Sequence, residues 1–304
     1  MSLAKKVKTA LDETRLLILG AQVLFGFQLN GAFQEAFADL SHSTRLLTCL
    51  GQFLMVLAIA LLIAPSMQHR IVEEGEDSNR IHGATTVYAG WALLPFEISL
   101  GIGAYEVFDH LYGRSVAFVM GTVFCLLAGF CWFGLEAIVK LSIGNKRMRE
   151  AEKPTPLSTK IEQMLTEARV ILPGAQALLG FQLTVTLTRS FEQLPEHVKQ
   201  VHVAALCCVG FAVVLLMTPA ALHRISFAGE DTPAFLRLGS AFVIAAPAFL
   251  ATGIVGDLFV ATYKAADSQA LALAIAAASA VLLALFWFAI PLYIRRGYRA
   301  SHLQ

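Results

Sequence analysis

Five polar side chains inside apolar segments are the residues of this sequence that could carry chemistry. They are Gln22, Gln28, Gln176, Gln182 and Glu97. An unpaired polar group in hydrocarbon costs several kcal/mol, so each of these side chains must face either protein or water. We expect them to line a polar path for ions, because an ionisable group inside a membrane segment marks function by default. The alternative is that the amides make hydrogen bonds between helices, beside the small residues Gly26 and Gly180.

A second set of polar residues recurs where apolar segments end. The pattern P-x-x-x-H-R-I occupies residues 65–71 and 219–225, G-E-D follows each copy, and an arginine precedes the first apolar run of each half. The set comprises Arg15, Arg169, His69, Arg70, His223, Arg224, Glu76, Asp77, Glu230 and Asp231. Such a cluster at a membrane surface could gate a pore or sense pH, since histidine titrates near neutral pH. The alternative is anchoring, in which arginine holds a helix end and the acidic pair caps the next helix.

Other chemistries lack a sequence signal. No nucleotide-binding, zinc-protease or nucleophile motif is present in a suitable context. The five cysteines lie in apolar stretches without metal-site spacing, and none of the eight histidines lies at the centre of an apolar run, which argues against haem. The 23 basic and 22 acidic side chains nearly cancel, which disfavours nucleic-acid binding. We therefore expect no catalytic residues, enzyme activity, metal, cofactor or nucleic-acid partner.

The composition indicates an integral membrane protein. Hydrophobic residues make up 57% of the 304 residues and charged residues 15%, against roughly 45–50% and about 25% in soluble domains. A helix needs about 20 apolar residues to cross the bilayer core. Seven uncharged runs reach that length, and an eighth is interrupted only by Glu97. The runs are 16–34, 46–68, 83–105, 115–135, 170–188, 203–222, 238–256 and 268–294. The chain is therefore predicted to be all-α, with eight transmembrane helices and the lipid bilayer as its surroundings.

The two halves are copies of one another at a shift of 154 residues. Residues 13–29 read ETRLLILGAQVLFGFQL and residues 167–183 read EARVILPGAQALLGFQL. An even number of spans in each copy predicts two parallel four-helix repeats, residues 1–141 and 167–304. Residues 142–166 form a charged linker that ends in an amphipathic helix on the cytoplasmic face or in an extension of the next span. Lysine and arginine gather in the linker and near both termini, which places both termini in the cytoplasm.

Acidic residues inside the apolar runs are not repeated. A two-residue deletion aligns Pro95 with Pro247 and pairs Glu97 with the apolar Phe249. Glu106 and Asp257 lie near the outer ends of their runs, where we expect them to reach interfacial water and to be structural.

The repeated text carries a resemblance. The pattern E-x-R-x-x-x-x-G-A-Q-x-L-x-G-F-Q-L, followed by P-x-x-x-H-R-I, resembles a family of bacterial four-helix membrane proteins of unknown function. The resemblance covers nearly the whole chain as two tandem copies. It implies a multi-pass protein of the bacterial inner membrane and no particular activity.

Two functions are consistent with these residues. We expect an ion channel or transporter, in which two chains place four quasi-equivalent units around an axis as a homo-oligomer. The alternative is a non-transporting membrane module that binds a protein or lipid at its cytoplasmic face.

Overall fold

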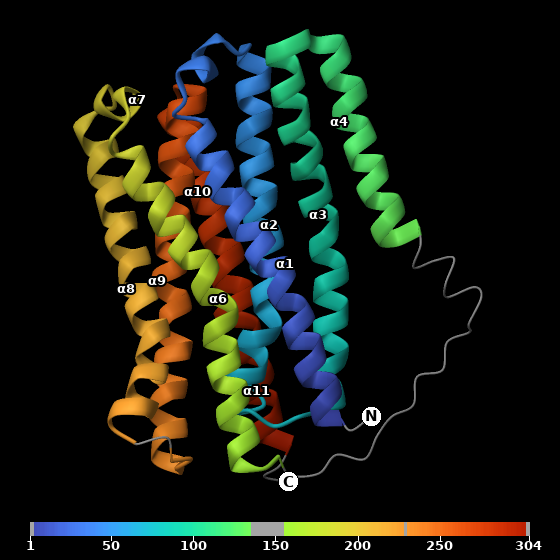
Figure 1. Cartoon of the computed structure of the whole chain (residues 1–304), viewed down its shortest axis with the longest axis vertical. Coiled ribbons are helices and arrows are strands. Elements are labelled where there is room, and N and C mark those ends of the chain that lie inside the picture. The colour runs from blue at the N-terminus through green and yellow to red at the C-terminus, as the bar shows by residue number, and fades with distance from the viewer. Residues whose placement is uncertain (1–2, 135–154, 228–229, 302–304) are drawn as a thin grey trace.

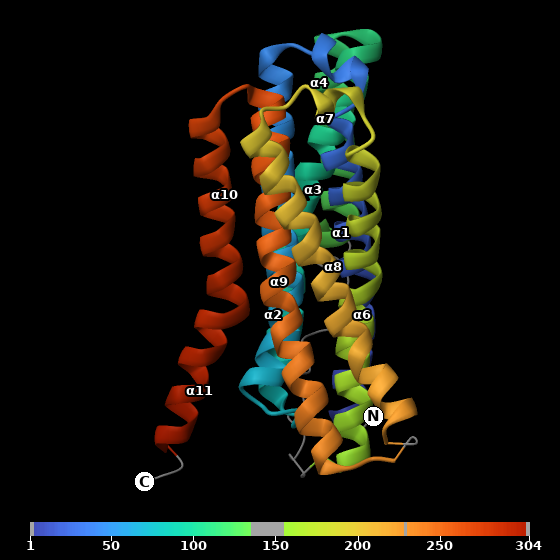
Figure 2. The same cartoon turned by 90° about the vertical axis from the view of Figure 1, so that its left-hand side faces the viewer.

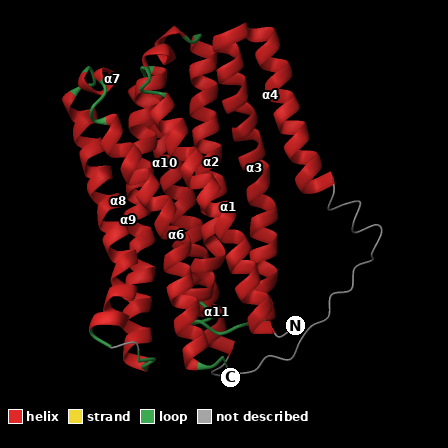
Figure 3. Ribbon diagram, viewed as in Figure 1, coloured by secondary structure: helices red, strands yellow, loops and turns green. Residues whose placement is uncertain are grey.

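The computed structural model describes residues 3–134, 155–227 and 230–301. Within these ranges the chain contains helices joined by short loops and no strand, and the long helices lie side by side along one direction (Figures 1 and 3). Residues 142–154 of the predicted linker lie outside the described ranges.

The helices of the two halves follow the same order. The first half contains α1 (Leu3–Gly31), η1 (Glu35–Asp39), α2 (His42–Ile71), α3 (Asn79–Tyr112), α4 (Arg114–Gly129) and η2 (Phe130–Gly134). The second half contains α6 (Leu157–Val185), α7 (Arg189–Glu192), α8 (Glu196–Ile225), α9 (Pro233–Ala266), α10 (Gln269–Ala284), η3 (Leu285–Ala289) and α11 (Ile290–Ser301). The segments η2 and η3 are single π-helical turns. Polar caps begin several helices, as when the hydroxyls of Ser78 and Thr232 accept the backbone N–H three residues later.

Seven described helices are long and apolar enough to cross a membrane: α2, α3, α4 with η2, α6, α8, α9, and α10 continuing through η3 into α11. The eighth predicted span, α1, is not among them because polar residues occupy both of its ends. It nevertheless runs most of the length of the bundle beside α6 (Figure 1). The helix α6 is unbroken from Leu157 onward. The stripe before the first span of the second repeat, for which a surface helix or an extension of that span was expected, is therefore the first part of the same helix.

Equal helix lengths align the two halves without the predicted two-residue deletion. Both α3 and α9 contain 34 residues. An added Cβ at Gly51 would touch Ile102, and one at Gly256 would touch Ala205, so the same pair of positions meets in both halves at a shift of 154. The alignment of Pro95 with Pro247 is therefore wrong, and Glu97 corresponds to Ala251 rather than to Phe249.

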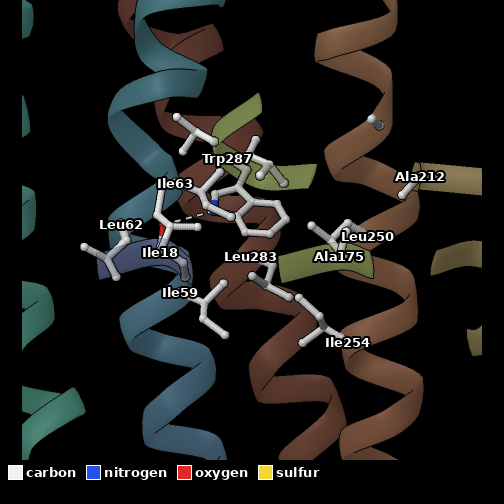
Figure 4. Packing of buried hydrophobic residues seen from close by; sticks show 14 of the residues in the cluster. Ile18, Ile59, Leu62, Ile63, Ala175, Ala212, Leu250, Ile254, Leu283 and Trp287 are labelled. Carbon is white, nitrogen blue, oxygen red and sulfur yellow. Dashed lines mark hydrogen bonds between the residues drawn. The ribbon is translucent and has the colours of Figure 1, made fainter. Parts of the chain in front are cut away.

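The largest apolar cluster lies where the two halves meet and includes residues of α1, α2, α6, α9 and η3. The helix α1 packs against α6, and α2 packs against α9, α10, η3 and α11. The side chain of Trp287 in η3 is fully buried, and its indole Nε1–H donates to the carbonyl oxygen of Ala60 in α2 at 2.9 Å (Figure 4). The helices α10 and α11 lie on the outer flank of the bundle (Figure 2), whereas α8 and α4 occupy opposite edges (Figure 1).

Trp287→Ala should lower the free energy of unfolding by ~3–5 kcal/mol, because it empties an enclosed site between the halves and removes a hydrogen bond to Ala60. Chemical unfolding in detergent micelles measures the change. Trp91→Ala is the matched control, since that side chain is 66% exposed. Equal losses in the two variants would contradict this packing.

Candidate functional site

The most enclosed charged cluster joins α2 to α6. The last turn of α2 supplies His69 and Arg70, and α6 supplies Glu167. The Glu167 Oε1 lies 2.6 Å from His69 Nδ1, and its Oε2 accepts from Arg70 Nε at 2.7 Å. The three side chains are at most 2% exposed. Arg70 also donates from Nη1 to the Ser240 hydroxyl of α9 at 3.4 Å, so the cluster connects three helices.

This cluster contains one residue that the sequence analysis missed. Glu167 begins the repeated pattern E-x-R, which indicates the duplication but was not interpreted as part of a site. A buried arginine needs a nearby carboxylate, so the repeated acid was the available signal. His69 Nε2 and Arg70 Nη2 are enclosed without a hydrogen-bond partner among the described residues.

The G-E-D loop of the first half docks onto the start of α6. The Glu76 carboxylate pairs with Lys160 and accepts the backbone N–H of Thr155 at 2.9 Å. Asp77 accepts from the Gln163 side chain at 2.6 Å. Burial raises the pKa of the Glu76 carboxyl, but hydrogen bonds from Lys160 and Thr155 outweigh burial and hold the pKa below its usual 4.5.

The matching residues of the second half have different surroundings. His223 Nε2 lies 3.5 Å from Asp231 Oδ1, and the imidazole stacks on Phe235 with ring centroids 4.6 Å apart. Arg224 and Glu230 are exposed. Arg169 is also exposed and Arg15 is half-buried. The structure therefore brings His69 and Arg70 onto α6, and separately docks Glu76 and Asp77 there, but it gives the second-half residues no equivalent partner.

An amide lies midway along the contact between α1 and α6. The Gln22 side chain is 2% exposed and lies against Gly174, where an added Cβ would come within 1.6 Å of its Oε1. Neither Oε1 nor Nε2 of Gln22 has a hydrogen-bond partner among the described residues. Such a group in a membrane protein is a place for water or an ion. Its counterpart Gln176 is exposed on the surface of the chain.

A polar cluster of the second half lies nearer the opposite end of the bundle. Gln182 Nε2 donates to Asp257 Oδ2 at 2.7 Å, and His202 Nε2 lies 3.1 Å from the backbone oxygen of Gln182. His202 Nδ1 lies 3.7 Å from Asp257 Oδ1. All three side chains are buried, so the expectation that Asp257 reaches interfacial water is wrong. A cavity of about 10 Å³ adjoins the cluster, which is near the smallest volume that can hold a water molecule.

The first half has a different polar cluster at the corresponding depth. Gln28 Nε2 donates to the Ser99 hydroxyl at 2.9 Å, and Gln52 donates to the Gln28 carbonyl oxygen at 3.0 Å. Thr48 donates to Glu106 at 2.8 Å. Thr48 occupies the position of His202, so only the second half places a histidine beside its carboxylate.

Glu97 lies apart from these groups, between α3 and α4. Its side chain is half-buried, and an added Cβ at Gly129 of α4 would come within 2.7 Å of its Oε1. Its Oε2 is enclosed without a partner among the described residues.

Polar groups therefore recur along α6. Two of them lie in the seam, which we define as the contact of α6 with α1 and α2. The third, Gln182, contacts α8 and α9 of the second half, beside a cavity that α1 also lines. Glu167, Gly174 facing Gln22, and Gln182 are spaced by seven and eight residues along α6. The helical rise puts successive groups about 10–12 Å apart. Buried apolar residues such as Ile171 and Leu178 separate them. In the part of the chain that the structure describes, no group of three or more His, Cys, Asp or Glu side chains could hold a metal ion.

Comparison with known proteins supports a duplicated domain. The model of a family of unknown function (DUF6328) matches residues 2–136 and again residues 153–291. No curated protein and no solved structure matches the chain. The two matches confirm the resemblance and the tandem duplication, and they name no activity.

Glu167→Gln should lower the free energy of unfolding by ~3–5 kcal/mol, because the buried Arg70 then lacks its counter-charge. Chemical unfolding in detergent measures the change. Glu192→Gln is the matched control, since Glu192 is exposed on α7. A Glu167→Gln variant as stable as the control would contradict the charged contact between the halves.

The lowered pKa of Glu76 makes its contact with α6 sensitive to acid. Because the folded-state pKa lies below the unfolded value of 4.5, the stabilisation is fully present above pH 4.5 and is lost as pH falls through the folded-state pKa. Glu76→Gln should therefore weaken the dependence of the unfolding temperature on pH below 4.5. The exposed Glu35→Gln is the control, and an unchanged pH profile for Glu76→Gln would refute the contact.

Proposed function

The chain belongs to this family of unknown function as two tandem copies, and from that premise we propose that it moves protons or small ions across a membrane along the seam between its repeats. The observation that carries the proposal is a series of polar groups at three depths, two of them in the seam and the third beside it. They are Glu167 with His69 and Arg70, the unpaired amide of Gln22, and Asp257 with His202 and Gln182.

Burial of these groups supports a role in transport. Ionisable side chains inside membrane segments are expensive and mark proton relays or ion pathways. Asp257 and His202 can each take up or release a proton, and the adjoining cavity of about 10 Å³ accommodates one water molecule. Gln22 adds unpaired donors and an acceptor between the two ends.

Apolar packing closes the seam in this conformation. An added Cβ at Gly26 would come within 2.0 Å of the Phe181 ring, so the helices are in tight contact between the middle and outer groups. Ions would pass only when water enters this contact, as at a hydrophobic gate. The proposal is therefore a gated channel or a transporter rather than a permanently open pore.

The proposed placement uses eight transmembrane helices, with α1 as the eighth, arranged as two parallel repeats in the bacterial inner membrane. The helices α1 and α6 begin, and α11 ends, at the same end of the bundle (Figure 1). The basic residues near both termini and at sequence positions 146–153 support a cytoplasmic location for that end. Of the four glutamines, Gln22 lies in the seam, Gln182 in the second-half cluster beside it, Gln28 in the first-half cluster, and Gln176 on the surface.

The second candidate is a membrane module that transports nothing and binds a protein or lipid at its cytoplasmic face. The hydrogen bonds of Gln28 and Gln182 favour it, because these amides link helices in the manner of structural groups. Flux measurements separate the two functions.

Asp257→Asn should reduce proton flux at least about tenfold, because a group that transfers protons contributes by that factor or more. The protein is reconstituted into liposomes with an internal pH-sensitive dye, and a potassium gradient with valinomycin drives the flux. Asn keeps the size of the side chain and can accept from Gln182, so folding is retained. The matched control Glu196→Gln changes a 76% exposed carboxylate and should leave flux unchanged.

Flux carried by Asp257→Asn at the wild-type rate would exclude the Asp257 path. Folded, correctly oriented wild-type protein that passes neither protons nor sodium, potassium or chloride would favour the binding module instead.

A further inference from the structure

The two repeats meet head to tail. The first repeat contributes one face, which we term the leading face, made of Gln22, Gly26, Ala60, His69 and Arg70. The second repeat contributes a different face, the trailing face, made of Glu167, Gly174, Phe181 and Trp287. Because the repeats are copies, the second repeat also has residues at the positions of the leading face, and the first repeat has residues at the positions of the trailing face. Within the described part of the chain, neither of these two faces is covered by the other repeat in the same way, although the Phe27 ring also packs on Phe181 with centroids 4.7 Å apart.

Most of the leading face of the second repeat is exposed among the described residues; His223 is half-buried because it stacks on Phe235. The face comprises Gln176, Gly180, Val214, His223 and Arg224, each 154 residues beyond its counterpart. Val214 is 60% exposed whereas Ala60 is fully buried. An added Cβ at Gly180 would meet no atom within 4 Å, whereas at Gly26 it would meet Phe181. In the 18-residue apolar segment of each helix, 67% of the residues are buried in α2 but only 33% in its counterpart α8.

Most of the trailing face of the first repeat is exposed as well, whereas Trp132 is half-buried against Phe96. The face comprises Glu13, Gly20, Phe27 and Trp132. Glu13 is exposed whereas Glu167 is 1% exposed, and Phe27 is 59% exposed. An added Cβ at Gly20 would meet nothing within 4 Å. On the adjacent α3, Leu111 is 59% exposed, whereas the matching Ala265 of α9 is fully buried.

We propose that a second copy of this chain covers both faces. In each copy, the leading face of the second repeat packs on the trailing face of the first repeat of the other copy. The dimer therefore contains this contact twice. Glu13 then lies between His223 and Arg224 of the second copy, and Gln176 lies over its Gly20. Phe27 fills the space beside Gly180, and the Trp132 indole donates to the backbone oxygen of Val214. The result is a dimer with four quasi-equivalent units.

Charge and shape favour a second copy over lipid as the occupant. Lipid chains offer no partner for the exposed Gln176, whereas Gly20 of a second copy receives it as Gly174 receives Gln22. The acid of one face and the His–Arg pair of the other are complementary, and the same pairing already holds within the chain. A head-to-tail contact of this kind forms a closed ring when it repeats with suitable rotation.

The geometry of the bundle allows that closure. The helices α1 and α6, which contribute to the two exposed faces, lie side by side along one side of the bundle, between α8 at one edge and α4 at the other. A single second copy on that side can therefore meet both faces (Figure 1). The repeats begin at the same end, so both copies keep one orientation in the membrane. This inference does not depend on the transport proposal, because a binding module would expose the same two faces.

Charge reversal tests the contact by mixing. Glu13→Arg and Arg224→Glu should each weaken dimerisation at least about tenfold, because like charges then oppose each other in both contacts. When the two variants are mixed, a heterodimer should form at the wild-type level, since one contact carries the reversed pair and the other the original pair. The measurement is native mass spectrometry of protein in lipid nanodiscs, with one variant mass-labelled.

The matched control Arg237→Glu, an exposed arginine of α9, should remain dimeric. The thermal unfolding temperature of each single variant shows that it is folded, and the variant Glu13→Arg/Arg224→Glu should dimerise alone. A monomeric wild type at every protein-to-lipid ratio would overturn the proposal and leave lipid as the occupant. Dimers that withstand both single reversals, or a mixture that forms no heterodimer, would also overturn it.

Discussion

A carboxylate from the second half of the chain, held between a histidine and an arginine from the first, determines how the two halves fit together. Glu167, His69 and Arg70 are almost completely enclosed, so a slip of α6 along α2 would leave buried charges without partners. The same register places Gly174 against Gln22 and aligns η3 so that Trp287 reaches the backbone of Ala60. The polar groups of the seam follow from that single arrangement.

Duplication preserved the backbone while the chemistry changed. The paired long helices have equal lengths, and in both halves the fourth of them runs into a π-helical turn with a Trp-Phe pair. Near the outer end, however, Thr48 and Gly103 occupy the positions of His202 and Asp257. A buried acid beside a histidine therefore occurs in one repeat only, and it adjoins the seam because α1 residues such as Leu29 line the neighbouring cavity.

Much of the fold was predictable, because long uncharged runs identify helices and near-identical text identifies the repeat. The alignment of Pro95 with Pro247 was wrong because it relied on matching two prolines. The equal lengths of α3 and α9, which contradict it, are known only from the caps and contacts of these helices. Of the candidate residues, His69 and Gln182 were identified by recurrence, whereas the burial of Asp257 depends on neighbours far away in the chain. The head-to-tail packing could not be predicted at all. Gly20 and Gly174 read alike in the sequence, yet only Gly174 receives a glutamine within the chain.

The separation of Arg70 from Glu167 affects how the molecule is made. The two residues are 97 positions apart, and the arginine is synthesised first. At typical rates of translation, about 5–20 s pass before the ribosome delivers the acid. During that interval Arg70 lacks the carboxylate that it pairs with in the folded chain, so its charge must stay in contact with water. The charged contact between the repeats therefore forms only after the first helix of the second repeat has been synthesised.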